Sequence, residues 1–129
     1  MAKVLIVEDD SLIVKIYTTR LQAEGFEVQS AQDGLEGVTK MREFVPDVVL
    51  LDVMMPKLDG FGLVTEIKKD PKLQTIPIIM YSNMNNEEEI QRAKSLGVVE
   101  FLIKANLTPN QVIEKIKQYL PNYDSARNA

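Results

Sequence analysis

Short apolar runs alternate along this chain with longer amphipathic stretches. The apolar runs are rich in β-branched residues and are continuous, which is typical of strands in a sheet covered on both faces. They predict strands at residues 4–7, 48–51, 76–81 and 99–103, and a short further strand is expected at 27–30. The stretches between them predict five helices, at residues 11–24, from 34 to about 44, from 61 to about 69, at 87–96 and from 109 onward.

Turn and capping residues mark several of these helix ends. Gly25 is placed to end the first helix, because glycine readily adopts the left-handed conformation found there. Asp33 with Glu36, and Thr108 with Gln111, have the three-residue spacing of capping boxes. These signals support the helix boundaries that the apolar pattern predicts.

Five strands alternating with five helices imply a parallel sheet with helices on both faces. Right-handed crossovers and short connections favour a doubly wound α/β fold, and 129 residues suit a single domain. We expect residues 1–121 to form this domain and the small, polar residues 122–129 to form a C-terminal tail.

The composition narrows the chemistry that this domain can perform. The chain has no Cys and no His, which excludes disulfides, thiolate metal sites and Ser-His-Asp catalysis. A net charge of −4 without a basic run disfavours direct binding of nucleic acid or an anionic membrane. The first apolar run is too short for a signal peptide or a membrane span, so we expect a cytoplasmic location.

Polar residues follow four of the predicted strands, at the edge where open parallel sheets bind ligands. They are Glu8, Asp9 and Asp10 after the first strand, Asp52 after the third, Ser82 and Asn83 after the fourth, and Lys104 after the fifth. Carboxylates, a hydroxyl and an ammonium suit phosphoryl transfer to an aspartate with Mg²⁺. Asp10 or Ser11 is expected to cap the first helix, which leaves Glu8 and Asp9 for the metal.

Four motifs in this order resemble the receiver domain of bacterial two-component response regulators, over nearly the whole chain. They are Val-Glu-Asp-Asp at 7–10, Asp-Val-Met-Met-Pro-Lys-Leu-Asp-Gly at 52–60, Tyr-Ser at 81–82 and Phe-Leu-Ile-Lys at 101–104. The resemblance is to stand-alone, chemotaxis-regulator-like members, although a domain freed from a larger regulator would show the same motifs. The resemblance implies a flavodoxin-like (βα)5 fold with strand order 2-1-3-4-5.

The resemblance also implies a role for each matching acidic residue. Asp52 accepts a phosphoryl group from a histidine kinase or a phosphotransfer protein. Glu8, Asp9, Asp52 and the backbone carbonyl of Met54 hold Mg²⁺. The domain is then a phosphoacceptor and not an enzyme.

Three further residues take roles in the switch that the resemblance implies. Lys104 pairs with the phosphoryl group, Ser82 moves inward to bond it, and Phe101 rotates inward in concert. These changes remodel the surface around the fourth helix, fifth strand and fifth helix, where a downstream protein partner binds.

Two alternatives differ in the chemistry that they require. A Mg²⁺-dependent phosphatase with an aspartyl nucleophile generally has a second Asp two residues further on, and Met54 at that position argues against it. A degenerate receiver would bind proteins without phosphorylation, and the intact acidic, hydroxyl and ammonium set argues against such decay.

The chain also departs from the usual family pattern. Ala105 stands where the family usually has a Pro after the lysine, so we expect a trans bond and a differently shaped loop there. Asn83 replaces a smaller residue and is placed to narrow access to Asp52 or to bond the phosphoryl group. Met54 and Met84 flank the path of a hydrolytic water by family analogy, which predicts a long-lived phosphoryl state.

Two neighbouring residues, Asp59 and Gly60, lie directly before the third predicted helix. Asp59 is placed to cap the third helix, and Gly60 to supply the turn conformation before it. Both have structural roles in this interpretation, although they lie within a motif of the resemblance.

Overall fold

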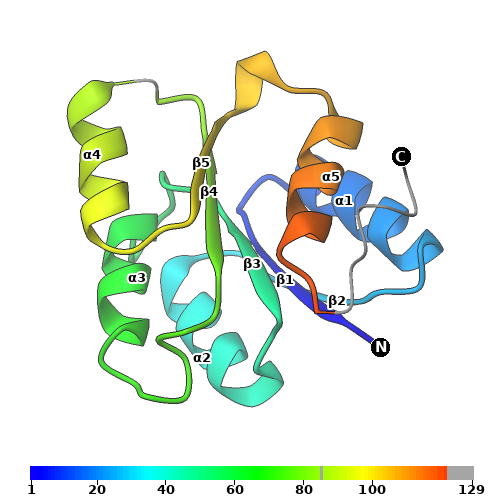
Figure 1. Cartoon of the computed structure of the whole chain (residues 1–129), viewed down its shortest axis with the longest axis horizontal. Helices are drawn as coiled ribbons and strands as arrows, with labels where there is room; N and C mark the ends of the chain where they lie inside the picture. The colour runs from blue at the N-terminus through cyan, green and yellow to red at the C-terminus, as the bar shows by residue number, and fades with distance from the viewer. Residues whose placement is uncertain (85, 122–129) are drawn as a thin grey trace.

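Five parallel strands form one sheet in the order β2-β1-β3-β4-β5 in a computed structural model of the chain (Figure 1). The structure describes residues 1–84 and 86–121, so the expected tail at 122–129 lies outside the described residues. The strands are β1 (Lys3–Val7), β2 (Glu27–Ala31), β3 (Val48–Leu51), β4 (Ile78–Ser82) and β5 (Glu100–Ile103). The predicted flavodoxin-like fold and its strand order are confirmed.

Helices cover both faces of this sheet, with α1 and α5 on one side and α2, α3 and α4 on the other (Figure 1). They are α1 (Ser11–Ala23), α2 (Gly34–Phe44), α3 (Gly60–Ile67), α4 (Glu87–Ser95) and α5 (Pro109–Gln118), with a 3₁₀ turn, η1 (Lys104–Asn106), before α5. Within the described residues, no helix combines the length and apolar character needed to cross a membrane.

Alternate residues of each central strand face the two helical layers. Val48 and Leu50 of β3 pack with α1 and α5, whereas Val49 and Leu51 pack with α2 and α3. All four are almost fully buried. Because successive strand side chains point to opposite faces, burial on both faces explains why the apolar runs are continuous.

The strand β4 begins two residues later than the sequence pattern predicts. Pro77 has no amide hydrogen to donate to a neighbouring strand, and its carbonyl accepts from the Val49 amide at 3.0 Å. The paired strand therefore starts at Ile78 and not at Ile76.

One of the two predicted capping boxes is complete. The Thr108 hydroxyl accepts from the Gln111 amide, and the Gln111 side chain accepts from the Thr108 amide. Asp33 accepts from the Glu36 amide at 2.9 Å, but the Glu36 carboxylate reaches the amide of Gln32 at 3.3 Å. The Glu36 carboxylate thus bonds the amide one residue before the Asp33 amide that a full box requires, so the second box is half-formed.

The role expected of Gly60 is wrong, whereas Asp59 caps α3 as expected by accepting from the Gly62 amide at 2.8 Å. Gly60 is not among the residues with positive φ. A Cβ at Gly60 would lie 2.8 Å from the Asp52 carbonyl oxygen and 2.9 Å from the Val53 Cα. Glycine is therefore needed for close approach of α3 to the backbone that carries Asp52.

Candidate functional site

Three carboxylates meet at the carboxyl ends of β1 and β3. Glu8, Asp9 and Asp52 each offer an oxygen, and these oxygens all lie within 4.8 Å of one another. Parallel pairing of β1 with β3 sets Val7 beside Leu51, and the Asp52 amide continues the ladder by donating to the Val7 carbonyl at 2.9 Å. Because both chains leave the sheet at the same level, their acidic residues converge.

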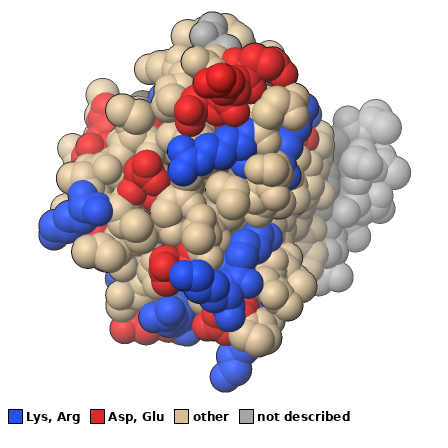
Figure 2. All heavy atoms as spheres, turned by 90° about the vertical axis from the view of Figure 1, so that its left-hand side faces the viewer, with Lys and Arg blue, Asp and Glu red and all other residues tan. Residues whose placement is uncertain are grey.

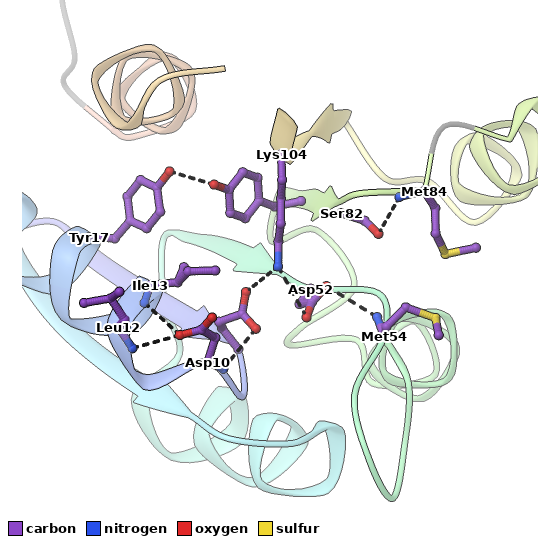
Figure 3. Close-up of polar contacts among 11 residues, drawn as sticks. Asp10, Leu12, Ile13, Tyr17, Asp52, Met54, Ser82, Met84 and Lys104 are labelled. Carbon is purple, nitrogen blue, oxygen red and sulfur yellow. Dashed lines mark hydrogen bonds and ion pairs between the residues drawn. The ribbon is translucent and has the colours of Figure 1, made fainter. Parts of the chain in front are cut away.

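Lys104, the residue directly after β5, closes this cluster. Its Nζ lies 2.7 Å from Glu8 Oε1 and 3.6 Å from Asp52 Oδ2 (Figure 3). Partial burial lowers the pKa of Lys104, but the Glu8 hydrogen bond and the charges of Asp52 and Glu8 outweigh burial and raise the pKa above its ordinary value. The ammonium is therefore charged and partly neutralises the acidic cluster.

Neighbouring acids of the cluster have different environments. Glu8 is 3% exposed and Asp52 is 7% exposed, whereas Asp9 is open to solvent. The side-chain interaction with Glu8, with smaller contributions from burial and from the Glu8 charge, raises the pKa of Asp9 above 3.8. Asp10 points away and caps α1, accepting from the amides of Leu12 and Ile13 as expected (Figure 3).

The loop after β3 turns back onto Asp52. The Met54 amide donates to Asp52 Oδ1 at 3.4 Å, and the Gly60 amide donates to the Val53 carbonyl at 2.9 Å. The first bond reaches the Asp52 carboxylate and the second ties the start of α3 to the backbone after it, while Met54 itself remains 65% exposed.

Ser82 and Phe101, the two predicted switch residues, make contacts outside this cluster. The Ser82 hydroxyl accepts from the Met84 amide at 3.2 Å, and Ser82 is 1% exposed (Figure 3). Phe101 is half-buried against the core on the α4 side, where it lines a hollow with Ile90 and Ala93. The structure thus describes one arrangement of both residues and leaves their predicted movement as a prediction.

The loop after Lys104 has a trans backbone, as the Ala105 substitution leads us to expect. The described residues contain no cis peptide bond, and Lys104 to Asn106 form the 3₁₀ turn η1. Asn83 is exposed at the end of β4. The fifth strand is therefore followed by a compact turn that begins at the ammonium-bearing residue itself.

The sequence reasoning missed two tyrosines next to the site. The hydroxyls of Tyr17 and Tyr81 lie 3.0 Å apart in the interior, and Lys104 Nζ lies 5.2 Å from the centre of the Tyr81 ring. One signal was available, because a tyrosine buried in a strand or on an apolar helix face needs a partner for its hydroxyl.

The donor set fits a hard divalent cation. Mg²⁺ prefers oxygen ligands and uses one or two carboxylates together with waters and phosphate oxygens. Such oxygens come from Glu8, Asp9 and Asp52 and lie close to one another, and Asp9 is open to solvent. The arrangement is therefore able to hold a metal ion beside a nucleophilic carboxylate, with an ammonium on its other side.

Comparisons with known proteins agree with this geometry. Residues 4–117 match the model of the response regulator receiver domain family. The chain is 38% identical over 124 residues to the probable transcriptional regulator ycf27 of Guillardia theta, covering 96% of this chain and 47% of that protein. It is 30% identical over 104 residues to the DNA-binding dual master transcriptional regulator RpaA of Synechocystis, covering 81% and 43%. The chain thus spans about half the length of such relatives.

Solved structures resemble the whole described domain. The chemotaxis protein CheY4 of Vibrio cholerae has a TM-score of 0.85 and 31% identity, covering 92% of this chain and 98% of that one. The phosphorylated cyanobacterial phytochrome response regulator RcpA has a TM-score of 0.77 and 30% identity, covering 91% and 89%.

Proposed function

The chain belongs to the family of response regulator receiver domains of two-component signalling, and on this premise we propose that it is a switch whose phosphoacceptor is Asp52. One observation carries the proposal. Asp52 is buried at the end of β3, with Glu8 and Asp9 on one side and the Lys104 ammonium 3.6 Å from its Oδ2. A nucleophile, a place for a metal and a cation thus share one small site.

Phosphoryl transfer needs an in-line nucleophile and stabilisation of charge on the transferred oxygens. In the proposed step, an Asp52 carboxylate oxygen forms a bond to phosphorus while the bond from phosphorus to the donor's imidazole nitrogen breaks. The nitrogen keeps the electron pair and takes up a proton. Lys104 donates hydrogen bonds to the phosphoryl oxygens once its contact with Glu8 is exchanged for them.

Glu8, Asp9, Asp52 and the Met54 carbonyl are the residues that we propose to hold Mg²⁺. The cation would neutralise charge on the phosphoryl oxygens. Asp9 is suited to keep ligand waters in place because it is open to solvent, whereas Glu8 is buried and bound to Lys104. The donor is a histidine kinase or a phosphotransfer protein.

The output is proposed to pass through the face formed by α4, β5 and α5. Ser82 would leave the Met84 amide to bond the phosphoryl group, and Phe101 would move into the hollow beside α4. A change of a few kcal/mol between two arrangements is sufficient for such a switch. Relatives that are transcriptional regulators suggest a transcriptional output, which we propose this chain reaches through protein contacts.

Intact-protein mass spectrometry after incubation with acetyl phosphate tests the proposal. We expect one added phosphoryl group that requires Mg²⁺ and disappears in Asp52→Ala. The matched control is Asp70→Ala, which removes an aspartate after α3 and is expected to accept the group normally. Absence of any addition, with Mg²⁺ binding intact by titration, would favour the phosphorylation-independent binding module instead.

A further inference from the structure

Two buried tyrosines connect α1 to the strand beside the site. Tyr17 on α1 is 2% exposed and Tyr81 on β4 is 7% exposed. Their hydroxyl oxygens lie 3.0 Å apart, and their rings meet edge to face at 86° with centres 5.7 Å apart (Figure 3). A buried tyrosine hydroxyl is stabilised by a partner, and here each hydroxyl supplies the partner of the other.

The face of the Tyr81 ring lies under the Lys104 ammonium, with Nζ 5.2 Å from the ring centre. The register explains this contact. Tyr81 pairs with Leu102 across β4 and β5, and both face the core on the α1 and α5 side. Lys104 comes two residues after Leu102 and therefore leaves the strand on the same face, so its side chain runs past the ring toward Glu8.

More than one contact is needed to fix the position of a lysine ammonium. Its ammonium is a compact charge on a flexible stem, and one hydrogen bond to Glu8 fixes its distance from that residue but not its direction. The Tyr81 ring attracts the cation from another side, and the Tyr17 hydroxyl fixes the orientation of that ring. The Glu8 bond and the ring together confine Nζ beside Asp52.

We propose that Tyr81 is a positioning residue for Lys104 and that Tyr17 holds the Tyr81 ring in place. This inference rests on the proposed function, since it assigns a purpose to the position of Lys104. When the Lys104 contact with Glu8 is exchanged for phosphoryl oxygens, the ring remains as the fixed attractor. The tyrosine pair then limits how far the ammonium moves.

The test combines a spectroscopic measurement with a rate. In protein carrying ¹³C-labelled lysine, the Lys104 ε-methylene protons, assigned by comparison with Lys104→Met, are expected upfield of those of exposed lysines, because the ammonium attached to this methylene lies over an aromatic ring. Tyr81→Leu should abolish this shift, whereas Tyr81→Phe should keep part of it, because the ring remains but loses its bond to the Tyr17 hydroxyl. Tyr17→Phe should reduce it, because the Tyr81 hydroxyl loses its partner while the ring remains.

The same variants are then phosphorylated with acetyl phosphate at saturating Mg²⁺. Tyr81→Leu is expected to lower the maximal rate about three- to thirty-fold, the range that corresponds to an exposed to a desolvated cation–π contact. Tyr17→Phe should lower it less, and Tyr81→Phe by no more than about three-fold. The matched control, Ile116→Ala, removes a buried side chain of the same core on α5 and should reduce stability without changing the shift or the rate.

An unchanged Lys104 shift in Tyr81→Leu would overturn the inference, as would an equal loss of rate in Ile116→Ala. If Tyr81→Leu does not fold, the shift in the unaltered protein and its reduction in Tyr17→Phe decide the matter. If the unaltered protein takes up no phosphoryl group, the proposed function fails. The shift, which is measured without phosphorylation, still tests the tyrosine pair.

Discussion

Two runs of three acidic residues occur in this chain, and they have different fates. Glu8, Asp9 and Asp10 follow a strand, and each has its own environment: one is buried against Lys104, one is open beside Asp52 and one caps α1. The second run, Glu87–Glu89, forms the first turn of α4. Figure 2 shows acidic side chains gathered at the upper end of the face that carries α4.

The difference lies in what the topology brings opposite each run. The first run meets Asp52 and Lys104, which directly follow two other strands and are themselves largely buried. The second run makes its contacts within α4, where Glu87 accepts from the Gln91 side chain at 2.9 Å and the positive end of the helix dipole lies close by. An acidic run can therefore hold a metal where sheet topology adds ligands from elsewhere, and otherwise stabilises a helix terminus.

Exchanging one carboxylate for an amide in each run separates the two roles most strongly. Glu8→Gln is expected to weaken Mg²⁺ binding about ten-fold or more, because a buried charged ligand is lost. Glu88→Gln, in the second run, is the matched control and should change the dissociation constant by less than about two-fold, because exposed charges are screened. Calorimetric titration of both variants measures this. An equal weakening in the two variants would mean that the metal responds to overall charge.

Substitutions beside the first acidic run are expected to give the next largest effect, a change in the half-life of the phosphoryl group. Met54 and Met84 lie on the side of Asp52 away from Asp10 (Figure 3), and apolar side chains there disfavour an ordered attacking water. Met54→Asn and Met84→Glu are each expected to shorten the phosphoryl half-life at least about three-fold, because polar groups orient water.

Met54→Leu is the control for this effect, because it keeps the side chain apolar and should leave the half-life unchanged. The decay of phosphorylated protein, followed by mass spectrometry after removal of the donor, gives each half-life. A fast loss in the unaltered protein that neither polar substitution changes would remove the basis for a long-lived state.

Much of the fold and of the site could be predicted from the sequence because local signals agree with the final topology. Four of the five strands are largely apolar runs with a polar residue at or directly after their end, so Asp52 and Lys104 had to reach the same edge once the strand order followed from the resemblance. The Asp10, Asp59 and Thr108 caps are local and were likewise predictable.

Contacts between distant side chains could not be predicted in the same way. Lys104 lies closer to Glu8 than to Asp52, and the Tyr17 hydroxyl meets that of Tyr81, 64 positions away. Both depend on register and on how side chains of different length fill the space between elements. A pattern of polar and apolar positions does not contain that information, and the same holds for the close approach that requires Gly60.

Replacement of Asp33, the acidic residue that caps α2, is expected to have a smaller effect, a loss of stability that depends on pH. The bond from the Glu36 amide, aided by the charge of Lys57, lowers the pKa of Asp33 below its usual 3.8. Stability from this carboxylate is therefore present above the unfolded value and is lost as pH falls through the folded pKa. Asp33→Ala should lower Tm by a few degrees at pH 7 and by less at pH 2–3.

Asp33→Asn separates the hydrogen bond from the charge, because asparagine can still accept the hydrogen bond from the Glu36 amide but has no charge to titrate. Its Tm should lie close to that of the unaltered protein at pH 7, and the acid-dependent part of the loss should be absent. Thermal unfolding followed by circular dichroism between pH 2 and 7 gives the three curves. If the difference in Tm between Asp33→Ala and the unaltered protein does not change with pH, the whole effect belongs to the hydrogen bond and none of it to the charge.

The smallest effect is expected from neutralising the acidic run at the start of α4, which should lower stability slightly. Glu87→Gln, Glu88→Gln and Glu89→Gln remove charges that interact with the helix dipole, each worth about 0.3–1 kcal/mol at low ionic strength. The Asn86 cap, which accepts from the Glu88 amide at 2.8 Å, stays in place, so α4 should still form. Urea unfolding should show a loss that shrinks in 0.5 M salt, because these charges are solvated and screened. A loss that persists in salt would mean that the run makes buried contacts, and the contrast with Glu8 would then be one of degree.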